Sequence, residues 1–351
     1  MSDPLIQLFV LPLVKLLVIL GAILLVVAYL TLLERRLLGF LQVRLGPNRV
    51  GPQGLLQPFA DVFKLFVKED LVPSGAQKFV FMLAPMLIFA PSFLLWSVIP
   101  FGETFTVGGV AIEPFVADLN IAVLFILAVS SIGVYGIILG GWSSNNKFSL
   151  MGGLRAAAQM VSYEVPMGFA VVSVVLLSGT LSMVGMVESQ RAAGLWWIFP
   201  GILGFGIYFV CGVAETNRNP FDLPEAEAEL VAGFHTEYSG MKFAFFYLAE
   251  YMNMLLISSL AVIFFFGGWL PPFPNLLAGL WALPVLSWIP PVVWYFAKVM
   301  CFIVVYIWFR GTFPRYRFDQ LMAIGWKWLL PLSLANVLLV GIGVLVFRVW
   351  G

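Results

Sequence analysis

Eight apolar runs, each long enough to cross a lipid bilayer as a helix, constrain the fold of this 351-residue chain more than any other feature. A hydrocarbon core about 30 Å thick requires about 20 apolar residues in helical form. Within such a core, a helix satisfies all of its own backbone hydrogen bonds. The sequence therefore predicts an all-α integral membrane protein, a bundle of about eight transmembrane helices in a single domain over 1–351, with spans at 11–33, 79–100, 116–141, 159–184, 195–214, 242–266, 291–309 and 328–347.

The composition excludes several classes of protein. Hydrophobic residues make up 61% of the chain and charged residues only 11%, against about 25% charged in soluble domains, so a water-soluble enzyme domain is excluded. With 19 basic and 18 acidic residues, the chain has no positive surplus that would favour nucleic-acid binding. Two cysteines cannot hold an iron–sulfur cluster, and one histidine cannot supply both axial ligands of a haem. We therefore expect this chain to bind no redox cofactor.

The distribution of basic residues predicts how the bundle is oriented in the membrane. The loops after the first, third, fifth and seventh runs carry fifteen of the nineteen lysines and arginines. Loops rich in lysine and arginine face the cytoplasm, or the matrix in an organelle. We therefore expect these four loops to be inner loops and both chain termini to lie on the outer side.

The inner loop at 34–78 begins with turns and continues with an amphipathic segment. The stretch 44–52 is dense in glycine and proline, which excludes a helix there. From Gln57 onward, Asp61 and Lys64 recur at helical spacing on one face, while phenylalanines occupy the other. We expect a short helix in the plane of the membrane interface, which acts either as a surface anchor or as a wall of an access path for a lipid-soluble ligand.

The inner loop at 215–240 concentrates acidic residues. Six carboxylates in 23 residues accompany one arginine, Arg218, which we expect to hold the loop through charge-assisted hydrogen bonds. If 224–231 is helical, Glu225 and Glu229 share a face and repel each other, and burial near the membrane would raise the pKa of at least one of them. A solvated acidic loop is the alternative, although apolar residues interleaved with the acids argue against it.

Ionisable residues inside the apolar runs form a second group of candidates, because a charge at the bilayer centre costs about 2.5–3.5 kcal/mol on insertion scales. Glu164 lies in the fourth run and Glu250 in the sixth. Glu164 would alternatively be a first-turn acid favoured by the helix dipole. Lys298, in the seventh run, would either extend its ammonium outward or pair with a carboxylate. Because the acids gather in the inner half, they indicate a proton relay that starts at the inner surface.

Several long, non-repetitive stretches give the chain a family resemblance over essentially its whole length. It resembles the family of H-type membrane subunits of proton-translocating NADH:quinone oxidoreductase, respiratory complex I, whose mitochondrial members are called subunit 1. The stretches that carry the resemblance are Glu34–Arg36, Arg44–Asp61, Gly153–Glu164, Ala214–Gly240, Phe245–Tyr251 and Arg310–Met322. Gly311 stands where alanine is expected and Val161 where isoleucine is common, and neither position is a candidate site.

The resemblance implies a role for both inner loops. Loops 34–78 and 215–240 would form the floor of a quinone chamber and the docking face for the hydrophilic arm, with quinone entering from the bilayer. The chamber and entrance residues so implied are Arg35, Arg36, Arg44, Asp61, Lys64, Arg218, Phe221 and Phe234. The relay toward the membrane arm would comprise Glu164, Glu215, Glu225, Glu227, Glu229 and Glu250.

The resemblance also implies partners and a location. Quinone would be the substrate, and electrons would reach it from NADH through FMN and iron–sulfur clusters on partner subunits. The partners would be the other membrane-arm subunits, the hydrophilic quinone-site subunits and membrane lipids. The membrane would be the bacterial inner membrane, or the mitochondrial inner membrane if the chain is organellar.

Three alternative functions stay open at the level of sequence. An ion-coupled secondary transporter usually carries internal repeats and broken helices at the midplane, and the chain has no visible repeat. The membrane subunit of a proton-pumping hydrogenase resembles this family, but the intact Gly-Pro-Asn-Arg stretch at 46–49 favours the quinone enzyme. A purely structural scaffold would have no use for acids inside the membrane.

Overall fold

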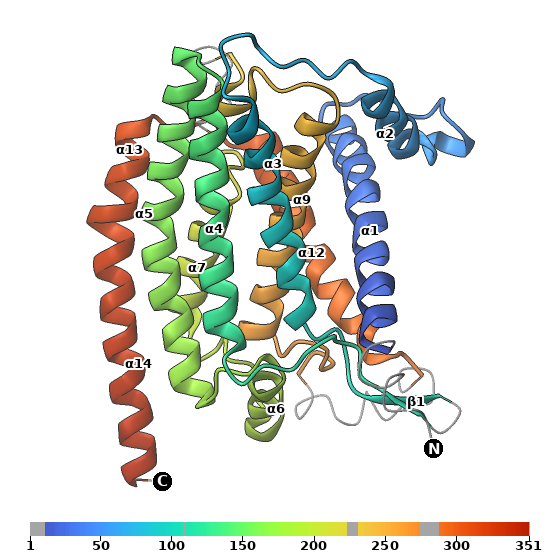
Figure 1. The fold of residues 1–351 in the computed structure, drawn as a ribbon. Helices are drawn as coiled ribbons and strands as arrows, with labels where there is room; N and C mark the ends of the chain where they lie inside the picture. The colour runs from blue at the N-terminus through green and yellow to red at the C-terminus, as the bar shows by residue number, and fades with distance from the viewer. Residues whose placement is uncertain (1–10, 108–109, 223–230, 274–287, 351) are drawn as a thin grey trace.

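The helices of a computed structural model confirm the expected all-α membrane fold (Figure 1). The structure describes residues 11–107, 110–222, 231–273 and 288–350. Within these ranges, seven helical segments are long and apolar enough to cross a membrane. They are α1 (Leu11–Leu41), α3 (Lys78–Leu94) with its 3₁₀ extension Leu95–Val98, α4 (Ala122–Ser143), α5 (Lys147–Ser178), α9 (Gly240–Phe265), α12 (Pro291–Thr312), and α13 (Phe318–Ala323) continued through a π-helical turn into α14 (Leu330–Trp350). The apolar helix α7 (Ile202–Glu215) is shorter, at 14 residues.

Several helices extend beyond the apolar runs that predicted them, and α1 and α5 show why. α1 continues to Leu41, so the first eight residues of the expected loop 34–78 are helical. α5 begins at Lys147, twelve residues before the expected span, because the Asn146 side chain caps it by accepting a hydrogen bond from the Phe148 amide (2.9 Å). Hydropathy marks the lipid-compatible part of a helix, whereas capping residues and helix propensity set its ends.

The amphipathic segment of the first inner loop forms the expected short helix, α2 (Gln57–Val67). Pro58 lies in its first turn, where a missing amide hydrogen has no helical partner to lose. Phe59, Phe63 and Phe66 on this helix are exposed. α2 lies beside the last turns of α1, at the end of the bundle that carries the basic loops (Figure 1).

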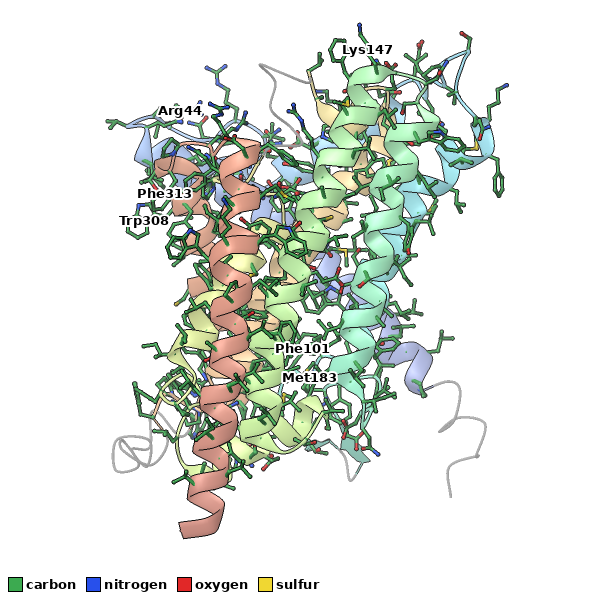
Figure 2. The ribbon with its side chains drawn as sticks, turned by 90° about the vertical axis from the view of Figure 1, so that its left-hand side faces the viewer. Arg44, Phe101, Lys147, Met183, Trp308 and Phe313 are labelled. Atoms are coloured by element: carbon green, nitrogen blue, oxygen red, sulfur yellow. The ribbon has the colours of Figure 1, made fainter. Side chains whose placement is uncertain are left out.

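Two 3₁₀ turns, Pro52–Gly54 and Gly233–His235, lie in the loops at the basic end, and the opposite end of the bundle holds other short elements. They are α6 (Met183–Ala193) and an antiparallel hairpin of β1 (Phe105–Val107) and β2 (Val110–Ile112), which the sequence analysis did not expect. α1 begins and α14 ends at this same end (Figure 1). Arg44 and Lys147 mark the basic end, whereas Met183 lies toward the other (Figure 2). The loops that the charge distribution groups together are therefore on one side of the bundle.

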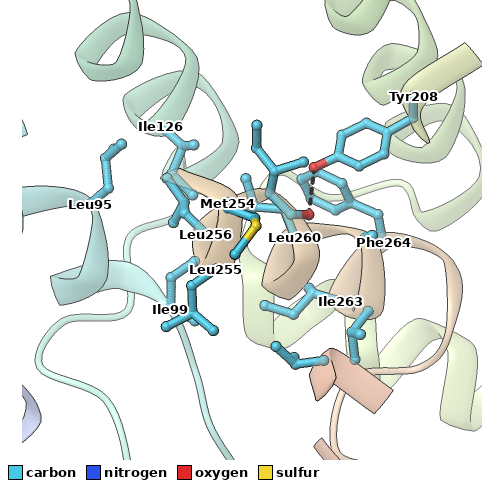
Figure 3. Close-up of a cluster of buried hydrophobic side chains, with 14 of the residues drawn as sticks. Leu95, Ile99, Ile126, Tyr208, Met254, Leu255, Leu256, Leu260, Ile263 and Phe264 are labelled. Carbon is cyan, nitrogen blue, oxygen red and sulfur yellow. Dashed lines mark hydrogen bonds between the residues drawn. The ribbon is translucent and has the colours of Figure 1, made fainter. Parts of the chain in front are cut away.

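α9 lies at the centre of the bundle and packs against α1, α3, α7 and α12, whereas α14 packs on α5 and α7 at the periphery (Figure 1). Leu255, Leu260 and Ile263 of α9 lie in a buried cluster with side chains of α4, α7 and the 3₁₀ extension of α3 (Figure 3). The Tyr208 hydroxyl donates a hydrogen bond to the Ile257 carbonyl oxygen (3.1 Å) within this cluster. Lipid is as apolar as the helix surfaces, so close packing and such hydrogen bonds, rather than exclusion of water, hold the helices together.

Gly136 allows α4 to pack directly against α3. A Cβ atom at this position would lie 2.4 Å from Ile88 Cγ1 and 2.9 Å from the Ala84 carbonyl oxygen, which is closer than real contacts allow. Gly133, one turn earlier on α4, has no neighbour within 4 Å of the corresponding position. The two glycines therefore form a matched pair, of which only one is required by packing.

Substituting Gly136→Ala should lower the thermal stability of the solubilised protein, because the added methyl group has to displace backbone of α3. Overpacking of this kind costs about 1–3 kcal/mol. Gly133→Ala is the control and should leave the midpoint of unfolding unchanged or slightly raised. Equal midpoints for the two variants, measured by scanning calorimetry or thermal aggregation, would contradict this packing.

Candidate functional site

Glu34, in the inner half of α1, is the centre of a buried ionic network. Its side chain is only 3% exposed. Arg218 donates from Nη1 to both carboxylate oxygens (2.8 and 3.0 Å), Arg310 of α12 donates to the same group, and the Tyr251 hydroxyl donates at 2.7 Å. Arg218 Nε also lies 2.7 Å from a carboxylate oxygen of Glu250 on α9. The negative charges of two carboxylates and the positive charges of two guanidiniums therefore compensate each other within this network.

Arg218 connects the parts of this network. Burial by itself would lower the pKa of Arg218, but the carboxylates of Glu250 and Glu34 more than offset that effect and hold it well above its ordinary value. Its guanidinium also lies 4.5 Å from the ring centre of Tyr251, in a cation–π contact. Among the described residues, its carboxylate partners are on α1 and α9 and not in its own acidic loop. Arg218 therefore holds its segment of the chain against α1 and α9. Its expected role in the fold of the acidic loop stays a prediction, because 223–230 lie outside the described residues.

Sequence reasoning did not single out Glu34, because the first apolar run ends at residue 33. A helical signal was present. Val27 and Leu30 are buried, and Glu34 follows them at spacings of seven and four residues, so the three side chains share one face of α1. Extending the helix by one turn before reading its periodicity would have placed a charged residue on the buried face.

Glu215 is the last residue of α7 and lines three small cavities inside the bundle. Their volumes are about 50, 40 and 20 Å³, and each exceeds the 10–15 Å³ that one water molecule needs. The first cavity is also lined by Glu250 and the second by Glu164. Within the described part of the chain, Glu215 Oε2 is buried with no hydrogen-bond partner, which a water in these cavities would supply. The structure thus brings together three of the predicted relay residues.

Glu164 lies seventeen residues into α5, so its interpretation as a first-turn acid is wrong. The Ser131 hydroxyl of α4 donates a hydrogen bond to its carboxylate. Gln159, earlier on α5, donates to the carbonyl oxygens of Ala214 and Phe221 (2.8 Å each) and so fixes the end of α7 against α5. This attachment positions Glu215 opposite the face of α5 that carries Glu164.

A much larger cavity, of about 540 Å³, lies between α1, α2 and α9. We call it the chamber. Arg35, Asp61 and Lys64, all predicted chamber residues, line one side of it, and Arg35 Nη1 pairs with Asp61 Oδ2 at 2.5 Å. Phe243 and Tyr247 of α9 line the other side. These two residues also line the first of the small cavities, so they form the wall between the chamber and the interior of the bundle.

The other predicted chamber residues are spread over the inner end. Arg36 donates to the Gln53 carbonyl oxygen, and Arg44 donates to the Gln42 side chain at 2.7 Å. Phe221 is buried between the rings of Tyr163 and Tyr316, and Phe234 lines the cavity that contains Glu215 and Glu250. Glu225, Glu227 and Glu229 lie outside the described residues, so their mutual repulsion stays a prediction.

Lys298 pairs with no carboxylate among the described residues, and its ammonium instead reaches the backbone beyond the end of α9. Its ammonium donates to the carbonyl oxygens of Phe266, Gly268 and Leu270 at 2.7, 2.9 and 2.6 Å. These carbonyls follow the last turn of α9, where helix ends leave acceptors without partners. A lysine one helix away supplies the missing donors, which a pattern of charges in the sequence does not indicate.

Among the described residues, no group of three His, Cys, Asp or Glu side chains is arranged to hold a metal ion.

Substituting Arg218→Gln should destabilise the protein by about 3–5 kcal/mol, because two buried carboxylates lose a partner. The double variant Glu34→Gln, Arg218→Gln should be less destabilised than the sum of the single variants, since charge is removed in balanced amounts. Arg317→Gln is the control: this arginine is 81% exposed in its pair with Asp319, so its loss should cost no more than about 1 kcal/mol. Additive losses in chemical denaturation would contradict the network.

Comparisons with known proteins agree on one family. A model of the family described as NADH dehydrogenase matches residues 14–341. The chain is 53% identical over 328 residues to the H subunit of NADH-quinone oxidoreductase from Magnetococcus marinus, covering 93% of this chain and 90% of that protein. It is 50% identical over 339 residues to the second H subunit of NADH-quinone oxidoreductase from Geobacter metallireducens, with coverage of 93% and 94%. For the second H subunit from Syntrophobacter fumaroxidans the identity is 48% over 341 residues, with coverage of 96% and 97%.

Proposed function

Because the chain belongs to the family of H subunits of NADH-quinone oxidoreductase, we propose that it forms the floor and entrance of the quinone chamber and links quinone reduction to proton translocation. It is a membrane subunit of an oxidoreductase complex. The single observation that carries the proposal is the chamber between α1, α2 and α9, together with its position next to the buried carboxylates.

The chamber suits an amphiphilic ligand with a polar head group and an apolar tail. Its volume falls within the range of about 300–1,000 Å³ that is usual for small-molecule sites. Arg35, Asp61 and Lys64 supply polar groups, whereas Val62, Leu65 and Leu248 supply apolar ones. The exposed phenylalanines of α2 lie beside it and would contact lipid, so a quinone tail would pass from the bilayer into the chamber without crossing water.

Charge in the chamber would act on the buried network over a short path. Arg35 lines the chamber and is adjacent in sequence to Glu34. The Tyr247 and Tyr251 hydroxyls are 3.0 Å apart, and Tyr251 donates to Glu34. A unit charge that appears ~10 Å from another changes its energy by about 1.7 kcal/mol at an effective dielectric constant of 20. Quinone reduction would therefore shift the protonation of the carboxylates beyond the wall.

The small cavities would carry this shift along the bundle. Water in them would join Glu250 to Glu215 and Glu215 to Glu164. Glu164 is half-buried and flanked by the exposed Val161 and Val165, and an acid at this depth would not face lipid. We propose that another membrane-arm subunit covers this face and continues the relay, while Glu225, Glu227 and Glu229 extend it at the inner loop.

The same proposal fixes the orientation and the source of electrons. The end with the basic loops and α2 would face the cytoplasm or matrix, where the hydrophilic quinone-site subunits dock, and the ends where α1 begins and α14 ends would be on the outer side. FMN and iron–sulfur clusters on partner subunits would deliver the electrons.

Replacing Glu215→Gln or Glu164→Gln should lower NADH:quinone reductase activity and proton pumping of the complex in proteoliposomes. We expect a fall of roughly tenfold or more, equivalent to about 1.4 kcal/mol in the barrier. Glu188→Gln is the control, because Glu188 is exposed on α6 and pairs with Arg191 at the other end of the bundle. Turnover and pumping at wild-type levels in both variants would defeat the relay assignment.

Filling the chamber tests its role as the quinone site. Ala28 of α1 lines the chamber, whereas Ala22 on the same helix is exposed. Ala28→Trp should raise the KM for quinone severalfold, because the indole takes up chamber volume, whereas Ala22→Trp should leave it unchanged. An unchanged KM in an assembled Ala28→Trp complex would show that quinone does not bind here.

A further inference from the structure

We propose that residues 68–71, directly after α2, form a strap that α9 holds in place, and that Ser239, Gly240 and Lys242 are positioning residues that set the width of the chamber. Three separate contacts join the strap to the start of α9, and each has a feature that helix formation alone does not explain. The functional consequence, although not the strap itself, rests on the proposed binding of quinone in the chamber.

Ser239 uses its hydroxyl for the strap and not for its own helix. It occupies the residue before α9, where a serine usually accepts a hydrogen bond from an amide of the first turn. No such cap is made here. The hydroxyl instead accepts from the Leu71 amide (3.0 Å) and donates to the Glu69 carbonyl oxygen (3.0 Å). It thereby satisfies backbone groups of the strap on both sides of Asp70.

Gly240 allows the strap to lie directly on the first turn of α9. Its φ of +56° lies in the left-handed region that favours glycine. A Cβ atom there would lie 3.2 Å from the Lys68 carbonyl oxygen and 3.6 Å from those of Glu69 and Leu65. A side chain at this position would push against the backbone of the strap and of the last turn of α2.

Lys242 adds an ionic contact further along the first turn of α9. Its ammonium lies 3.0 Å from Asp70 Oδ2 and 5.3 Å from the ring centre of Phe81. Lys242 is 12% exposed, whereas Asp70 is 53% exposed. The lysine is therefore fixed by the bundle, and the strap is the part that it holds.

The strap matters because α2 has only two polar attachments to the long helices within the described part of the chain. One is the Arg35–Asp61 pair with α1, and the other is the strap on α9. Lys68, Ser239 and Gly240 line the chamber at the second attachment. Releasing the strap would allow α2 to move away from α9, which widens the chamber on that side while the attachment to α1 persists.

The test measures chamber opening and quinone kinetics in the same purified complex. A cysteine at Ala244, a buried chamber residue on α9, reports opening through its rate of alkylation by N-ethylmaleimide, in a Cys301→Ala background and quantified on this chain by mass spectrometry. We expect Ser239→Ala and Lys242→Asp to raise that rate about fivefold, which corresponds to ~1 kcal/mol in the opening equilibrium. The charge swap Lys242→Asp, Asp70→Lys should restore it, and Lys147→Asp, an exposed inner-face lysine outside the chamber, should not change it.

The kinetic readout separates this proposal from the proposed function. The KM for quinone should change in the two strap variants and return to the wild-type value in the charge swap, whereas kcat should be less affected. NADH oxidation by the soluble acceptor ferricyanide should stay at wild-type levels in all of these variants. Faster alkylation with an unchanged KM would support the strap and overturn quinone binding in the chamber. Alkylation at the wild-type rate in both strap variants, in complexes with normal ferricyanide activity, would overturn the strap.

Discussion

The pairing of Glu34 with Arg218 is the contact on which the inner half of the bundle depends. Removing one charge from such a buried pair leaves the other without compensation, at a cost of several kcal/mol, so the partners have to be present together. The network joins four segments that are far apart in the sequence. Its members are Glu34 on α1, Arg218 after the end of α7, Glu250 on α9 and Arg310 on α12. Satisfying the charges therefore fixes the mutual arrangement of four segments, and the chamber and the small cavities form around that arrangement.

The position of the network supports the proposal that the chain couples a change in the chamber to the carboxylates of the bundle. On one side is the chamber, with Arg35 and Asp61, and on the other are the water-sized cavities, with Glu215 and Glu164. Tyr247 lines both spaces. On the proposed function, an electrostatic change in the chamber would reach the carboxylates without direct contact between quinone and any of them, and the electrons would come from partner subunits.

Much of this architecture was predictable from sequence, because lipid imposes strict rules on length and polarity. The apolar runs predicted the helices, and the spacing of Asp61 and Lys64 against phenylalanines predicted α2. The pairing of charges was not predictable. Glu34 and Arg218 are 184 residues apart, and nothing in a local pattern connects them.

Two further residues show the same limit. Lys298 was expected either to extend its ammonium outward or to pair with a carboxylate, and its observed partners are backbone carbonyls, which no side-chain pattern reveals. Ser239 occupies the position before α9 where a serine usually caps the helix, yet its hydroxyl accepts a hydrogen bond from Leu71, 168 residues away. Local rules predict which elements form, and the long-range satisfaction of buried polar groups decides how they meet.

The most direct test of the account is infrared difference spectroscopy of the intact complex, recorded between its quinone and quinol states. If reduction in the chamber shifts protonation in the bundle, the wild-type spectrum contains a carboxylic C=O band that changes with quinone reduction, and Glu215→Gln removes or displaces it. An identical band in the wild type and in this variant, with quinone fully reduced in both, would contradict the account.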